Sequence, residues 1–133
     1  MVTVTAGGVY VVRDRSLSLP PNHDRTVHEH RPVVVISGPN TNSDLVWRTV
    51  LVVPTSSSTT LRTRFCVKLS AGDGNLDRKT WARIPAIQPL LKADLETFLG
   101  ILPADKLSEV QARCLEFMGL FDDEDDEIVK PPF

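Results

Sequence analysis

The side chains best suited to acid–base chemistry lie in one short polar segment. His28 and Glu29 stand side by side with His30 directly after them, and an extended backbone would place the two imidazoles on one side. Imidazole and carboxylate groups both exchange protons, and imidazole does so near neutral pH. We therefore expect His28 or Glu29 to transfer protons, with solvated loop side chains as the alternative. No metal site is predicted, because the spacing marks no third ligand.

An arginine and a run of hydroxyl groups could bind a phosphate. Arg31 precedes Pro32, which keeps the arginine backbone extended at the mouth of the apolar run that follows. A fixed guanidinium binds phosphate oxygens through parallel hydrogen bonds, although Arg31 would serve equally as a surface charge that caps a sheet. Residues 55–60 are all threonine or serine, and they could donate hydrogen bonds to phosphate or form an ordinary polar loop.

These residues stand between segments whose patterns predict short β-strands. Gly8–Val12, Pro32–Ser37 and Trp47–Val53 are rich in apolar and β-branched residues and are separated by turn residues, which is typical of strands. Residues 61–69 alternate apolar with mostly basic side chains, which predicts a half-buried strand with a basic outer face. Residues 13–30 are expected to form a long polar loop.

The C-terminal half of the chain predicts further strands and one helix. Residues 81–91 are expected to be extended chain interrupted by Pro85 and Pro89, and residues 95–102 fit a strand or a helical turn. Pro103–Gly119 is the clearest helix, since proline favours a helix start and glycine a helix end. Its predicted apolar face consists of Leu107, Val110, Cys114, Phe117 and Met118. The chain therefore predicts a mainly β fold, a small antiparallel β-barrel with a C-terminal helix.

Length and charge indicate one domain with an acidic tail. The chain has 133 residues, of which 41% are hydrophobic, enough to bury a single core. We expect the domain to span residues 1–121 and the tail to span residues 122–133. The tail holds six of the 17 acidic residues but one of the 15 basic residues, which leaves a mildly basic body. Such a body permits a polyanionic partner without demonstrating one.

Several classes of protein are excluded by what the sequence lacks. It has no nucleophile elbow, phosphate-binding loop or dinucleotide fingerprint, which argues against common hydrolase and nucleotide-cofactor enzymes, and no cofactor is expected. The residues from Met1 to Val12 do not resemble a signal peptide, and no apolar run is long enough to span a membrane. We therefore expect a soluble cytoplasmic protein in which Cys66 and Cys114 are buried thiols.

The order of the segments resembles one known family. The chain presents Gly8–Val12, a polar loop, His30–Ser37 with its Arg-Pro-aliphatic start, and Val50–Ser56 with its Val-Pro-Thr-Ser end. Ala86–Pro89 lies near the place of a short Asp-Gln-Pro or Asp-Gln-aliphatic element of that family. In combination, these features resemble the MazF/PemK/Kid family of toxin ribonucleases, over a stretch from about Gly8 to Gly119.

The resemblance implies an SH3-like β-barrel with a C-terminal helix and the toxin component of a type II toxin–antitoxin pair. It further implies a homodimer whose RNA groove spans both subunits, a cognate antitoxin as partner, and an endoribonuclease that cleaves single-stranded RNA without a metal ion, through attack by the RNA's own 2′-OH. Arg31 matches the family's catalytic arginine. Thr55, or Ser56 one residue later, matches the catalytic hydroxyl, and His28-Glu29 resembles the family's His-Glu pair with a shorter spacing to Arg31. The residues expected to bind RNA are Arg62, Arg64, Lys68, Arg83 and Gln88.

One departure from the family pattern keeps two alternatives open. Pro85 and Ile87 stand where some members carry an arginine and an aspartate, and Arg83 could compensate from two residues upstream. The chain could therefore be a catalytically weak or inactive member that binds a partner. A CcdB-like inhibitor of gyrase is a further alternative, although that branch depends on a C-terminal Trp-Gly-Ile, whereas this chain ends in Lys130–Phe133.

Aromatic residues and the acidic tail give two more expectations. Trp47, Phe65 and Trp81 could stack on unpaired bases if they are exposed, and burial in the core is the alternative for each. Residues 122–133 could be a disordered, solvated end, or an acidic segment that occupies the basic groove in place of RNA.

Overall fold

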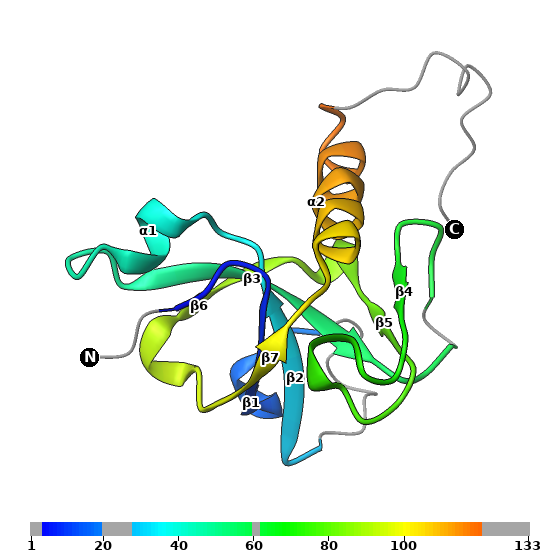
Figure 1. Cartoon of the computed structure of the whole chain (residues 1–133), viewed down its shortest axis with the longest axis horizontal. Coiled ribbons are helices and arrows are strands. Elements are labelled where there is room, and N and C mark those ends of the chain that lie inside the picture. The colour runs from blue at the N-terminus through cyan, green and yellow to red at the C-terminus, as the bar shows by residue number, and fades with distance from the viewer. Residues whose placement is uncertain (1–3, 20–27, 60–61, 121–133) are drawn as a thin grey trace.

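The computed structural model describes residues 4–19, 28–59 and 62–120, and it has an antiparallel sheet with a helix against it (Figure 1). The strands are β1 (Gly8–Arg13), β2 (His30–Val35), β3 (Thr49–Ser56), β4 (Val67–Leu69), β5 (Thr80–Ala82), β6 (Gln88–Leu91) and β7 (Thr97–Ile101). The helices are α1 (Pro39–Ser43) and α2 (Ala104–Phe117), and short 3₁₀ turns are η1 (Asp14–Ser16), η2 (Asp73–Asn75), η3 (Ile84–Ala86) and η4 (Lys92–Asp94).

Strand β3 is the centre of the sheet. The strand order is β4-β5-β3-β2-β1-β7, and every pair is antiparallel. One edge of β3 pairs with β2, while its other edge is shared by β6 along Thr49–Val52 and by β5 at Thr55 and Ser56. The result is a bent half-barrel with a C-terminal helix, which confirms the predicted fold class.

Both faces of the central strands are buried, which explains their uninterrupted apolar sequence. Val9, Val34 and Val53 face one core cluster, which α2 covers through Val110 and Cys114. Val12, Val33, Val35 and Val52 belong to a second cluster on the other face. Leu17 and Leu19 cover that second cluster from the segment after β1.

Helix α2 packs one face on the sheet, as its sequence predicts. Val110 and Cys114 are buried, and Phe117 packs edge-on against Phe65 with 5.2 Å between ring centroids. Met118 departs from the expected face, because it is 55% exposed just after the helix ends. Burial raises the pKa of the Cys114 thiol to about 11, so this side chain behaves as a small apolar residue.

Two expectations about the chain between strands need correction. The segment 61–69 was expected to be one strand, but the regular strand is Val67–Leu69, preceded by a turn in which the backbone N–H of Cys66 donates to Thr63. The described start of the segment 13–30 is not simply a polar loop, because residues 14–16 form η1 and Leu17 and Leu19 are buried. Local alternation and polarity do not predict where β4 begins or that these two leucines are buried, because both features depend on tertiary packing. The tail at residues 122–133 lies outside the described residues, and so does His23, the third histidine of the polar segment.

No helix among the described residues has the length and apolar character needed to cross a membrane.

The turn between β4 and β5 packs against β1 and β7. Gly74 in η2 has φ +55°, and a Cβ built on it would meet the side chains of Val9 in β1 and Leu102. The Asn75 side-chain amide donates to the carbonyl of Leu99 at 2.7 Å, which ties this turn to β7. Glycine is required at position 74 because a Cβ there would collide with the Val9 side chain at 2.4 Å and would need a left-handed backbone.

We expect Gly74→Ala to lower the free energy of unfolding by about 3 kcal/mol, the sum of steric overlap and left-handed strain. Gly38→Ala is the matched control, since a Cβ at Gly38 meets nothing within 4 Å and its φ is −77°. Urea unfolding monitored by circular dichroism measures both. Equal midpoints for the two variants would contradict the role of Gly74.

Candidate active site

Arg31 is held by a buried carboxylate that directly follows β1. The Asp14 side chain is 0% exposed, and the Arg31 side chain is 12% exposed. Arg31 donates from Nε to Asp14 Oδ1 at 2.7 Å and from Nη2 to Asp14 Oδ2 at 3.3 Å. Its Nη1 donates to the backbone carbonyl of Thr55 at 2.7 Å, at the end of β3. The guanidinium is therefore fixed in one orientation between the ends of three strands.

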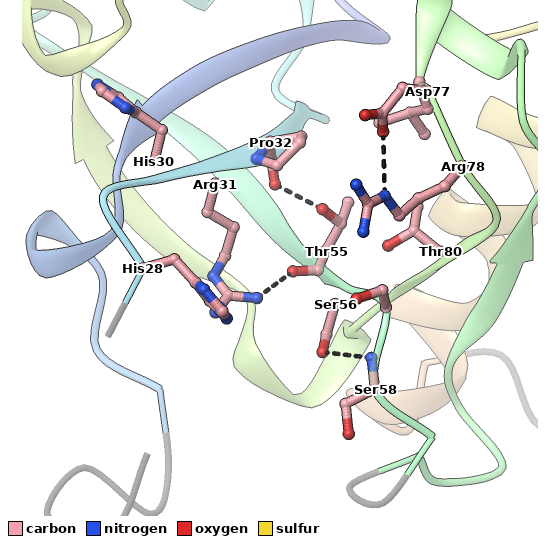
Figure 2. A pocket seen from close by; sticks show the side chains of 12 residues that line it. His28, His30, Arg31, Pro32, Thr55, Ser56, Ser58, Asp77, Arg78 and Thr80 are labelled. Atoms are coloured by element: carbon pink, nitrogen blue, oxygen red, sulfur yellow. Dashed lines mark hydrogen bonds and ion pairs between the residues drawn. The ribbon is translucent and has the colours of Figure 1, made fainter. Parts of the chain in front are cut away.

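Three of the five N–H groups of Arg31 are used in these bonds, counting partners in the described part of the chain. The other two, one on each terminal nitrogen, remain for a ligand. Figure 2 shows the guanidinium between His28 and Thr55 at the wall of a pocket. A guanidinium fixed in this way can donate two hydrogen bonds to an anion without first losing side-chain freedom.

The alternation of side chains along β3 distinguishes the two candidate hydroxyls. Thr55 is 2% exposed, and its Oγ1 donates to the carbonyl of Pro32 at 2.7 Å, so its proton is already used. Ser56 is half-buried, and its Oγ accepts a hydrogen bond from the backbone N–H of Ser58 at 3.2 Å. An oxygen that accepts in this way keeps its own proton available. Ser56 is therefore the hydroxyl that can donate to a ligand.

A pocket of about 370 Å³ collects these groups. One wall holds His28, His30 and Arg31, the floor holds Thr55 and Ser56, and the opposite wall holds Asp77, Arg78 and Thr80 (Figure 2). The backbone N–H of His28 donates to Asp14 Oδ2 at 2.8 Å, so the carboxylate that orients Arg31 also fixes the chain next to it. The pocket thus combines an imidazole, a hydroxyl and two guanidinium groups.

Glu29 faces a neighbouring cavity instead. That cavity, of about 360 Å³, is lined by Arg13, Arg15, His28, Glu29 and His30, so His28 and His30 border both spaces. His30 is partly engaged, because its Nε2 lies 3.2 Å from Glu96 Oε1, while Arg13 Nε contacts Glu96 Oε2 at 3.2 Å. Of the two predicted proton-transfer residues, His28 is the one that lines the pocket beside Arg31.

Arg62, Arg64 and Lys68 lie outside the pocket, along the outer face of β4 and the turn before it. All three are exposed. The Arg62 guanidinium carbon lies 4.8 Å from the ring centroid of Trp81, and that of Arg64 lies 4.7 Å from the ring of Phe65. Their expected role in binding RNA stays a prediction that is compatible with their exposure.

Arg83 and Gln88 both make hydrogen bonds to backbone carbonyls of other segments. The Gln88 amide donates to the carbonyls of Ser18 and Ala86 and accepts from the N–H of Ser18 at 3.0 Å, so it anchors the segment after β1. Arg83 is half-buried, and its backbone N–H donates to the carbonyl of Pro54 at 2.8 Å. An RNA contact by either residue stays a prediction, and the Gln88 amide already has a structural role.

Sequence reasoning missed Asp14 and Arg78. A lone aspartate after a strand gives no signal of its own, and only the pairing of β1 with β2 brings it to Arg31. Arg78 belongs to a run of charged residues, Asp77–Lys79, that fits any exposed turn. The structure places Arg78 across the pocket from His28, with its Nε 3.4 Å from Asp77 Oδ1.

Comparisons with known proteins give the family from a sequence model and the fold from solved structures. A family model described as PemK-like, MazF-like toxin of type II toxin-antitoxin system matches residues 16–118. An endoribonuclease from a mycobacterial species superposes with a TM-score of 0.66 at 16% identity, covering 92% of this chain and 98% of the other. A MazE–MazF structure from Deinococcus radiodurans has a TM-score of 0.66 at 20% identity, covering 90% and 99%.

A third structure is a mycobacterial endoribonuclease in complex with its cognate antitoxin, with a TM-score of 0.65 at 17% identity and coverage of 90% and 97%. At these identities the structural likenesses establish the fold. No curated protein matches the chain by sequence.

The buried ion pair predicts a pattern of stabilities. Asp14→Asn or Arg31→Gln alone should each lower the free energy of unfolding by about 3 kcal/mol, because each removes one charge of a buried ion pair and with it the opposite charge that faces the other side chain. The double variant, Asp14→Asn with Arg31→Gln, should regain most of that loss, because two neutral amides can bond to each other. Chemical denaturation of the four proteins measures this cycle. A double variant whose loss equals the sum of the single losses would show that the pair is not coupled.

Proposed function

Because the chain belongs to the family of PemK-like, MazF-like toxins of type II toxin–antitoxin systems, we propose that it is an endoribonuclease that cleaves single-stranded RNA without a metal ion. The observation that carries the proposal is the pocket in which a fixed guanidinium, Arg31, lies beside a hydroxyl, Ser56, and an imidazole, His28. These are the groups that cleavage by an internal 2′-OH needs.

In the proposed reaction, the RNA 2′-oxygen attacks the adjacent phosphorus while its proton passes to a base. The bond from phosphorus to the 5′-oxygen breaks, and that oxygen takes up a proton from the protonated base or from water. The products are a 2′,3′-cyclic phosphate and a 5′-hydroxyl. Negative charge grows on the non-bridging phosphate oxygens, where the two remaining N–H groups of Arg31 and the Ser56 hydroxyl donate hydrogen bonds. Both donors are held before substrate arrives, so little reorganisation is required.

His28 is the residue we propose for proton transfer. It is exposed, it lines the pocket, and its backbone is fixed beside Arg31 through Asp14. Glu29, the alternative from the sequence, borders the neighbouring cavity and accepts a backbone hydrogen bond from Asp14 through its carbonyl.

Pro85 and Ile87, which replace the arginine and aspartate of some family members, have packing roles in the fold. Pro85 lies in the η3 turn, and Ile87 packs against the core cluster that α2 covers. These positions therefore support the sheet beneath the pocket, and the charged groups of this site come from other segments, Arg78 among them. This arrangement supports an active enzyme over the inactive alternative, and the family match does not favour a CcdB-like gyrase inhibitor.

The proposed setting follows from the family. A toxin that cleaves cellular RNA works in the cytoplasm, and we propose that a cognate antitoxin binds it, as the antitoxin binds in the mycobacterial complex. We also propose a homodimer. Large apolar side chains are exposed on β7 and on the loop before β3, and burying them between two copies would remove them from water. They include Leu45, Val46, Phe98 and Ile101.

Cleavage of an end-labelled single-stranded RNA in EDTA tests the activity. We expect fragments that end in a 2′,3′-cyclic phosphate and no cleavage when the nucleotide at the cut site is 2′-deoxy. Arg31→Gln should slow cleavage roughly 100-fold or more, because a charge-assisted contact to the transition state is lost. Intact RNA after incubation with folded wild-type protein, across a panel of sequences, would reject the proposal.

Ser56→Ala and Thr55→Val separate the two hydroxyls. We expect Ser56→Ala to reduce the cleavage rate roughly 100-fold with little change in stability, because it removes a donor to the transition state. Thr55→Val keeps the side-chain shape and the carbonyl that holds Arg31, so it should cost about 1 kcal/mol of stability and reduce the rate far less. Single-turnover rates and thermal unfolding measure both effects. The opposite order of rates would make Thr55 the reacting hydroxyl.

A further inference from the structure

The outer face of the sheet continues the pocket as a row of three side chains. Ser56 of β3 lies directly opposite Trp81 of β5, and Trp81 lies directly opposite Lys68 of β4. Residues directly opposite in neighbouring strands share one face of the sheet and have their Cβ atoms about 5 Å apart. The partners next to them in register, Thr55, Ala82 and Val67, are all buried and face inward. Trp81 is therefore the outward neighbour of the proposed catalytic serine.

One face of the Trp81 ring is covered by an arginine side chain. Trp81 is half-buried, and the guanidinium carbon of Arg62 lies over the ring, 4.8 Å from its centroid. Arg62 itself is exposed. A planar cation on an indole occupies the same position that a stacked base would take, because both use the face of the π-system. Arg62 can leave this position without disturbing the core.

The hydrogen bonding of the Trp81 indole N–H gives a second observation. Trp81 Nε1–H is buried and has no hydrogen-bond partner within the described residues. Buried donors are nearly always paired, so an unpaired one beside a ligand pocket marks a place where an acceptor is expected. Because this N–H lies in the plane of the indole, a base stacked on the ring cannot accept from it, whereas a phosphate or sugar oxygen of the same strand beside the ring can.

We propose that Trp81 is the stacking platform for an unpaired nucleobase next to the phosphate that Arg31 and Ser56 bind. The inference rests on the proposed ribonuclease function for its substrate class. On binding, the base takes the place of the Arg62 guanidinium on the ring. Arg62 and Lys68, which border the ring, then lie beside the RNA backbone as cations. Stacking of this kind tolerates different bases and adds affinity at one fixed position.

The chain offers Trp47 as a matched control. Trp47 is 56% exposed and precedes β3, whereas Ser56 ends β3, so the two lie at opposite ends of the strand. In Figure 1, the helix α1 next to Trp47 and the β4–β5 pair that carries Trp81 lie at opposite ends of the molecule. Loss of either tryptophan removes an accessible indole, but only Trp81 lies beside the pocket.

The experiment measures binding of an RNA whose cut-site nucleotide is 2′-deoxy, so that binding is separated from cleavage. We expect Trp81→Ala to weaken binding roughly 10- to 100-fold, Trp81→Phe to retain most of the affinity, and Trp47→Ala to bind like wild type. RNAs that lack one base at a time next to the cut site locate the contact. At one position, removal of the base should weaken wild-type binding and should have little effect on Trp81→Ala.

Fluorescence gives a readout that does not depend on the alanine variant being folded. In the Trp47→Phe protein, the emission of Trp81 should be quenched when this RNA binds, and 2-aminopurine at the located position should be quenched in turn. Equal RNA affinity of Trp81→Phe, Trp81→Ala and wild type, with no quenching, overturns the stacking inference. A Trp81→Ala effect on antitoxin binding but none on RNA assigns the surface to a protein partner and also overturns it.

The two proposals fail in different ways. If wild type cleaves RNA but the Trp47→Phe protein shows no quenching of Trp81 and removal of single bases causes no loss, the stacking inference fails and the ribonuclease proposal stands. If wild type cleaves no RNA yet RNA quenches Trp81 in the Trp47→Phe protein, the ribonuclease proposal fails and the stacking inference stands.

Discussion

The buried ion pair between Arg31 and Asp14 is the constraint on which the pocket depends. It joins the residue after β1 to β2, and the third bond of Arg31 reaches the end of β3. Two charges removed from water are costly unless their geometry is good and their remaining hydrogen bonds are satisfied. The Asp14 carboxylate meets this condition by also accepting from the backbone of His28. The same contacts that stabilise the pair therefore set the positions of the guanidinium and the imidazole.

The second constraint is the register of β3. Because side chains alternate along a strand, Thr55 faces the core and Ser56 faces outward, and a shift of one residue would exchange them. Both edges of β3 are paired, and Val52 and Val53 are fully buried on opposite faces, so such a shift would expose both core clusters. The choice of reactive hydroxyl is thus a consequence of core packing rather than of the loop that follows.

Much of this architecture was predictable from the sequence, for identifiable reasons. The apolar runs of β1, β2 and β3 and the helix from Ala104 to Phe117 carry strong local patterns, so they were predicted nearly at their observed bounds. Arg31 and the Thr55–Ser56 pair stood out because they flank such runs, but their catalytic role was predicted from the resemblance to the MazF/PemK/Kid family. Asp14 was not, since its role arises from cross-strand pairing. Trp47 shows a second limit, because its apolar context predicted the start of a strand, whereas β3 begins at Thr49 and Trp47 is 56% exposed before it.

Pairing with Asp14 also changes how Arg31 takes part in binding a polyanion such as RNA. A guanidinium beside a buried carboxylate forms a nearly neutral unit at long range, so it adds little to the attraction that brings RNA to the surface. Its value lies in two directed N–H groups at short range, where the phosphate charge develops. Long-range attraction falls instead to exposed cations such as Arg62, Arg64 and Lys68. Binding and transition-state stabilisation are therefore assigned to different arginines. Salt screens exposed charges more than buried ones, so it should weaken RNA binding far more than transition-state stabilisation.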